Sequence, residues 1–100
     1  MTTPRVKVCC IASPREARLA IRYGAAALGL VGPMPTGPGP ITDEEIRMIA
    51  DGVPPPVATF LLTSETATGA IVAHHRGVHT NTIQLVDELK EGAYADLHAA

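Results

Sequence analysis

Large aromatic side chains are scarce in this sequence, whose 100 residues include two Tyr, one Phe and no Trp. A core must then be built from aliphatic residues, and 46% of the chain is hydrophobic. Cores of Val, Ile, Leu and Ala are typical of buried parallel strands covered by helices. Excess charge is missing as well, because the formal net charge is −2. This balance argues against a basic patch, so nucleic acid is not an expected partner.

Long apolar runs and a targeting signal are also missing. No apolar stretch approaches the ~18 residues of a transmembrane helix, and residues 1–5 lack the charged-then-apolar pattern of a signal peptide. The two cysteines, Cys9 and Cys10, are adjacent. Neighbouring strand residues point to opposite faces, so a disulfide between them is not expected. We expect a cytoplasmic protein with reduced thiols and no membrane contact.

Strand and helix patterns alternate four times along the chain. Strands are predicted at 6–11, 27–31, 57–62 and 82–86, and helices at 14–23, 43–51, 65–76 and 89–99. Residues 32–40, rich in Pro and Gly, can form neither element and are predicted to be a loop. This alternation predicts a single α/β domain over 1–100, with a parallel sheet and right-handed crossovers.

Short polar signals mark where the helices begin and end. Ser13 with Glu16, and Thr42 with Glu45, have the spacing of capping boxes. Thr63 or Ser64 is expected to cap the third helix. Gly24 and Gly77 are expected to end the first and third helices.

Side-chain periodicity assigns the buried faces of the first two helices. Leu19 and Tyr23 are four residues apart, with Ala17, Ala20 and Ile21 widening the same stripe. This spacing predicts that the stripe packs inward. Ile46 and Ile49 are expected to do the same in the second helix.

The stretch Val6–Ser13 combines a buried strand with an immediate helix start. It places Cys9 near the carboxyl end of the strand, where parallel α/β folds hold their chemistry. The nearby helix N-terminus favours the thiolate form. Strand alternation puts Lys7 and Cys9 on one face and Cys10 on the other, under the helices. Cys9 is therefore either a catalytic thiol or a small buried core residue, and the residues alone leave both open.

Other polar residues have structural interpretations. His74 and His75 sit late in a helix, where cations suit its dipole, and no metal-ligand spacing surrounds them, so no metal site is expected. Lys7 is expected to pair with a carboxylate from another strand. The acids Asp87 and Glu88 are expected to begin the last helix.

Several segments together resemble one enzyme family. V-K-V-C at 6–9 is similar to the Val-Lys-Ile-Cys opening of phosphoribosylanthranilate isomerases. G-A-A-A-L-G-L-V at 24–31 is similar to the family's Gly-Ala-Asp-Ala-Val-Gly-Phe-Val. The helix start at 41–44 and N-T-I-Q-L at 81–85 follow in the family's order. The resemblance covers nearly the whole chain.

The resemblance implies a fold and a reaction. The family is a TIM (β/α)8 barrel, and four βα units correspond to its N-terminal half. Cys9 would be the general base in the Amadori-type aldose–ketose isomerisation of N-(5-phosphoribosyl)anthranilate, a step of tryptophan biosynthesis. The substrate is a phosphorylated sugar-anthranilate, and no cofactor is implied. The family's general acid, an aspartate after the fifth strand, and its phosphate-binding loops lie beyond this chain, so the isolated chain is expected to be inactive.

Three positions depart from the family pattern. Cys10 replaces the glycine after the catalytic cysteine, residues 37–40 lack the loop arginine, and Val86 replaces a histidine. The alternative to an isomerase is a non-catalytic half-barrel of the same ancestry that acts as an assembly or binding module. In either case the face carrying Val31, Leu62 and Leu85 is expected to need a partner, either a second copy or the rest of a longer barrel.

Overall fold

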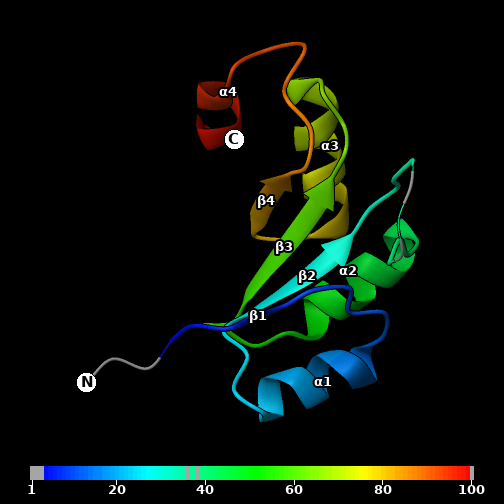
Figure 1. Ribbon diagram of the computed structural model, residues 1–100, viewed down its shortest axis with the longest axis vertical. Coiled ribbons are helices and arrows are strands. Elements are labelled where there is room, and N and C mark those ends of the chain that lie inside the picture. Colours follow the sequence, from blue (N-terminus) through cyan, green and yellow to red (C-terminus); the bar gives the residue numbers. More distant parts are fainter. Residues whose placement is uncertain (1–3, 36, 38, 100) are drawn as a thin grey trace.

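The computed structural model describes residues 4–35, 37 and 39–99. Strands and helices alternate four times, as Figure 1 shows. The strands are β1 (Lys7–Val8), β2 (Ala27–Val31), β3 (Ala58–Thr63) and β4 (Thr82–Leu85), and the helices are α1 (Pro14–Arg22), α2 (Asp43–Gly52), α3 (Thr68–Val78) and α4 (Tyr94–Ala99). Neighbouring strands pair in parallel in the order β1-β2-β3-β4. The predicted class, four βα units on a parallel sheet, is confirmed, whereas one domain over 1–100 stays a prediction.

Helices cover one face of the sheet. Along this layer α1 contacts α2, α2 contacts α3 and α3 contacts α4. On this helix face, Leu28 and Leu61 of the central strands are fully buried in one cluster with Ile46 and Ile49 of α2, which confirms the inward face of that helix. Burying one such side chain contributes roughly 1.5–3 kcal/mol relative to leaving it exposed. The aliphatic core predicted from composition therefore lies between the sheet and α1–α3.

The opposite face, here called the open face, has no helix layer in the described part of the chain (Figure 1). Strand alternation and register place on it Lys7, Ala27, Gly29, Val31, Ala58, Phe60, Leu62, Thr82 and Gln84. Leu85 pairs with Thr63, one residue beyond Leu62, so its side chain points to the helix face. The prediction that Leu85 lies on the open face was wrong. Gln84 is the residue that aligns with Leu62, and a shift of one residue along a strand moves a side chain to the opposite face.

Polar caps begin α1 and α2. The Thr42 hydroxyl accepts from the Glu45 N–H at 3.1 Å and the Glu45 carboxylate accepts from the Thr42 N–H at 3.2 Å, a complete capping box. The Ser13 hydroxyl accepts from the Glu16 N–H at 3.1 Å. The Glu16 carboxylate, however, accepts from the Ala12 N–H at 2.6 Å, one residue before the cap. Both predicted helix starts are confirmed.

The buried face of α1 is narrower than its periodicity predicted. Ala17 is 4% exposed, and Ala20 and Ile21 pack against the core from the same side. Leu19 and Tyr23 were expected on this face, but they are 55% and 84% exposed. The helix packs through Ala17, Ala20 and Ile21, so Leu19 and Tyr23 lie outside the contact. Gly24, at φ +98°, follows the helix as predicted.

Helix α3 begins and ends later than predicted. Thr63 is a buried strand residue whose hydroxyl accepts from the Glu65 N–H at 3.0 Å. The N-cap residue of α3 is Ala67, whose side chain makes no capping hydrogen bond. Neither Thr63 nor Ser64 therefore caps this helix. Gly77 lies inside it, and His79 takes the left-handed conformation at its C-terminus, at φ +65°.

Both ends of the chain carry less regular structure than predicted. Strand β1 has only two residues because Cys10, at φ +59°, turns the backbone out of the ladder. Helix α4 covers 94–99 instead of 89–99, and Asp87 and Glu88 lie in the loop before it, so they are not helix-start acids. Within the predicted loop 32–40, residues 36 and 38 lie outside the described residues, and the rest carries no helix or strand apart from a Val31–Pro40 bridge. No described helix has the length and apolarity to cross a membrane.

Candidate functional site at the carboxyl ends of the strands

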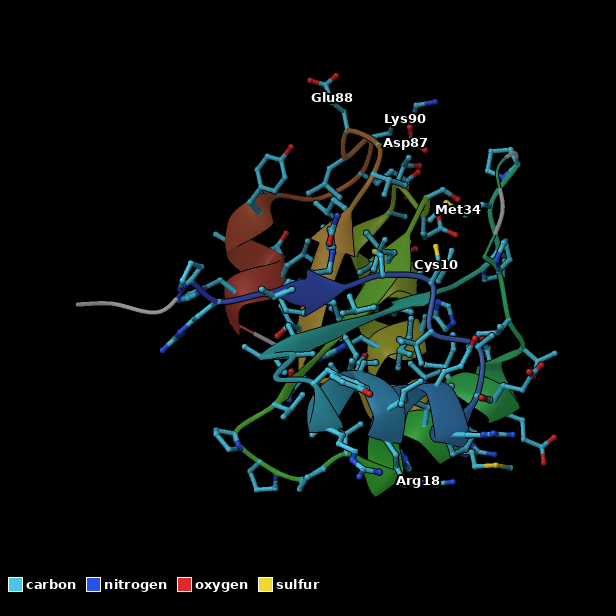
Figure 2. The ribbon with its side chains drawn as sticks, turned by 60° about the horizontal axis from the view of Figure 1, so that its bottom comes forward. Cys10, Arg18, Met34, Asp87, Glu88 and Lys90 are labelled. Carbon is cyan, nitrogen blue, oxygen red and sulfur yellow. The ribbon has the colours of Figure 1, made fainter. Side chains whose placement is uncertain are left out.

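The loops that follow the four strands meet at one end of the sheet. Figure 2 shows Cys10, Met34, Asp87, Glu88 and Lys90 at this end and Arg18 on the opposite side of the molecule. The loops are joined by hydrogen bonds. The Ser64 hydroxyl donates to the Pro33 carbonyl at 3.1 Å, and the Lys90 N–H donates to the Thr66 carbonyl at 2.8 Å. A strand-like bridge joins Ala67 to Glu91. These contacts hold the loops around the end of the sheet.

Cys9 lies directly after β1 at this end, and it is exposed. Its sulfur lies against Gly29 of β2: a Cβ at position 29 would be 2.6 Å from Cys9 Sγ and 3.2 Å from Cys9 Cα. The Ile11 N–H donates to the Gly29 carbonyl at 3.1 Å, which fixes the backbone beyond the thiol. Gly29 is on the open face, so Cys9 points to the predicted side. The thiol is presented to the space above the open face.

Cys10 does not occupy the core position expected of it. It is exposed, and its sulfur lies against Gly39, where a Cβ would be 2.8 Å from Sγ and 3.4 Å from Val31 Cγ2. Val31 is an open-face residue, so Cys10 turns toward the same side of the sheet as Cys9. The left-handed backbone at Cys10 breaks the strand alternation on which the prediction relied.

Glycines 29 and 39 were not identified from the sequence as parts of a site. A glycine inside a strand often marks a place where another backbone or a ligand approaches closely. Gly29 carries that signal, since it stands in the middle of β2. Gly39 is one of several glycines in a loop, and nothing in the sequence separates it from the others.

We predict that Gly29→Ala destabilises the protein by about 1–3 kcal/mol, the usual cost of overpacking. The new methyl group would overlap Cys9 Sγ and crowd Cys9 Cα and Leu62 Cδ1, so the Cys9 side chain must move and its backbone must give way slightly. Denaturant unfolding measures the effect. Gly69→Ala is the matched control, because position 69 is an exposed helix residue with open space around a Cβ. Because it lies in the first turn of α3, it should not destabilise the protein, and its gain should stay below the roughly 0.5–1 kcal/mol of a mid-helix Gly-to-Ala change. Equal stabilities of the two variants would contradict the close approach of Cys9 to Gly29.

Lys7 makes a contact across the open face. Its Nζ donates to Gln84 Oε1 on β4 and lies 5.0 Å from the centroid of the Phe60 ring. Lys7 was expected to pair with a carboxylate. Its observed partner is instead the side-chain amide oxygen of Gln84. Strands β1 and β4 are the two edges of the sheet, about 14 Å apart if it were flat. Lys7 aligns through β2 with Ala58, whereas Gln84 aligns with Leu62, four residues further along β3. The two side chains meet because the sheet twists and curls around the open face.

Two histidines join neighbouring helices. His74 Nε2 is 2.7 Å from Asp43 Oδ1 and His79 Nδ1 is 2.8 Å from Asp51 Oδ1, so both pairs link α3 or its C-cap to α2. Partial burial, reinforced by Arg76 and then by His74, lowers the pKa of His75. The described residues contain no group of three or more His, Cys, Asp or Glu side chains that could hold a metal ion.

Known proteins share both the sequence pattern and this arrangement. No family model matches the chain. Curated N-(5'-phosphoribosyl)anthranilate isomerases match at 30% identity over 81 residues (Methanocella arvoryzae) and at 32% over 80 residues (Halorhodospira halophila). The chain spans 38% of the length of each of these relatives.

Solved structures give the same result. The phosphoribosyl anthranilate isomerase of Thermotoga maritima superposes with a TM-score of 0.76 at 29% identity, over 83% of this chain and 40% of that one. An isomerase in complex with reduced 1-(o-carboxyphenylamino)-1-deoxyribulose 5-phosphate has the same TM-score and identity, over 83% of this chain and 42% of that one.

The four βα units, the curled sheet and the exposed strand ends are those of half a TIM barrel, which defines the structural class of this chain. More particularly, the chain is homologous to phosphoribosylanthranilate isomerases over about four fifths of its length and corresponds to the N-terminal half of their barrel. The predicted family resemblance is confirmed.

Proposed function

We propose that this chain supplies the N-terminal half of an isomerase that acts on N-(5-phosphoribosyl)anthranilate, with Cys9 as the general base. The observation that carries the proposal is the exposed Cys9 thiol at the carboxyl end of β1, seated against Gly29 and facing the open side of the sheet. A base must come within hydrogen-bond reach of the proton that it removes. Cys9 meets that need for a substrate bound above the open face.

In the proposed reaction a general acid protonates the ring oxygen as the C1–O bond breaks and an iminium forms. Cys9 then takes the proton from C2, and the electrons of that C–H bond neutralise the iminium nitrogen to give the enol-amine that tautomerises to the ketose. The described loops after β3 and β4, at the same end of the sheet as Cys9, carry the carboxylates Glu65, Asp87, Glu88 and Glu91, and all four residues are exposed. We assign the acid and the phosphate-binding groups to the second half of the barrel. The open face, with Phe60 and Leu62, would then pack against side chains of that half. That half would come from a longer chain or from a separate partner chain, because a second copy of this sequence would repeat the same residues.

A non-catalytic half-barrel remains the second candidate. It is favoured by Val86, which is 44% exposed and occupies the position of the family's histidine. A binding or assembly module would use the open face to contact its partner and would not require the Cys9 thiol. The two candidates therefore differ in what happens when the missing half is supplied.

The test is co-production of this chain with the C-terminal half of the Methanocella arvoryzae isomerase, followed by an assay for consumption of N-(5-phosphoribosyl)anthranilate. We expect no turnover from this chain alone, because it lacks the proposed acid, and measurable turnover from the co-purified pair. The C-terminal half alone is the control. A stable, folded complex without turnover would favour the assembly module, and turnover by the isolated chain would show that the acid lies within it.

A further inference from the structure

Cys9 and Cys10 bring two thiols to one side of the sheet. Adjacent residues of a regular strand point in opposite directions. Here Cys10 has a left-handed backbone and its sulfur lies against Gly39, where a Cβ would also be 3.4 Å from Val31 Cγ2, an atom of the open face to which Cys9 points. Both cysteines are exposed. The pair therefore forms a vicinal dithiol at the mouth of the half-barrel.

Each sulfur lies against a glycine. A Cβ at Gly29 would be 2.6 Å from Cys9 Sγ, and a Cβ at Gly39 would be 2.8 Å from Cys10 Sγ. The glycines come from β2 and from the loop that follows it, so two segments accommodate the pair. Any larger residue at either position would push a sulfur away.

The backbone at Cys10 is unfavourable for cysteine. A φ of +59° lies in the region that glycine occupies freely and that other residues adopt at a cost. Such outliers cluster at functional sites, where the surrounding structure maintains them. A glycine here would relieve the strain but remove the second thiol. The left-handed backbone at Cys10 is an observation independent of the exposure of the pair.

We propose that Cys9 and Cys10 form a two-thiol binding site for a thiophilic trivalent metalloid, of which a monosubstituted arsenical is the representative. Thiolates are soft ligands and select soft acceptors. A monosubstituted arsenic(III) oxide forms two As–S bonds while its oxygen leaves as water with the two thiol protons, and no oxidant or reductant is needed. Structural zinc requires four ligands, and the described residues offer no third His, Cys, Asp or Glu beside the pair. The site therefore fits an acceptor that needs only two sulfur atoms.

The test uses the reduced, full chain and phenylarsine oxide. The chain has two cysteines in all, so thiol titration reports on this pair alone. We expect one equivalent to remove both titratable thiols and to add the mass of the arsenical less one water. A dithiol should reverse the adduct and an excess of monothiol should not. The adduct should also raise the melting temperature, since a ligand that binds the folded state preferentially stabilises it.

Cys9→Ser and Cys10→Ser are the matched variants. Each retains one thiol, so each should form only an adduct that monothiol removes, with no rise in melting temperature. Binding of two equivalents, an arsenical that bridges two chains, or an unchanged or lowered melting temperature of the parent adduct would overturn the proposal. None of these readouts depends on isomerase activity, so the result stands apart from the test of the proposed function.

Discussion

Cys9→Ser in the completed barrel is expected to lower kcat by about 10²–10⁴-fold, the usual contribution of a positioned general base. The serine hydroxyl is nearly isosteric with the thiol but ionises far less readily, so the substitution removes the base while keeping the shape. KM should change little, because the base interacts with the transferring proton in the transition state and contributes little to binding of the substrate. Steady-state kinetics on the co-purified halves measure both constants.

Met48→Ala is the control for this comparison. Met48 is 57% exposed on α2, in the helix layer and away from the strand ends, and its variant should keep parental kinetics. If Cys9→Ser retained the parental kcat while the complex stayed folded, Cys9 would not be the base, and the proposed mechanism would fail even though the fold assignment would stand.

Leu28→Ala is expected to cost about 2–5 kcal/mol of stability, as large-to-small substitutions in packed cores do. Leu28 is 0% exposed on β2 and belongs to the main core cluster with Leu61 and Ile46. A chain of this size has little stability to lose. Chemical denaturation should show a large fall in the midpoint or complete loss of the folded state.

Leu19→Ala is the matched control, because it removes the same atoms from a residue that is 55% exposed. Its effect should stay within about 0.5 kcal/mol, as for most surface substitutions. A cost similar to that of Leu28→Ala would restore the original expectation that Leu19 lies on the buried face of α1, and it would contradict the packing through Ala17.

The sequence by itself determined the alternation of the elements and the class of fold. Capping residues such as Thr42 act within a few residues of the chain, so the starts of α1 and α2 follow from local spacing. The position of Cys9 near the carboxyl end of the first strand followed in the same way, although β1 ends at Val8, one residue before it. The family resemblance was carried by short collinear segments, and the comparisons confirmed it.

Tertiary structure decided which side chains point where. The exposure of Leu19 depends on how α1 sits on the sheet, which helical periodicity alone does not define. The contact of Lys7 with Gln84 joins residues of the first and last strands and exists only in the curled sheet. Cys10 leaves its predicted side because one backbone angle is left-handed, and Gly39 accommodates its sulfur from a distant part of the chain. Local spacing determines the elements, whereas contacts between segments far apart in the sequence determine the orientation of the side chains that form the site.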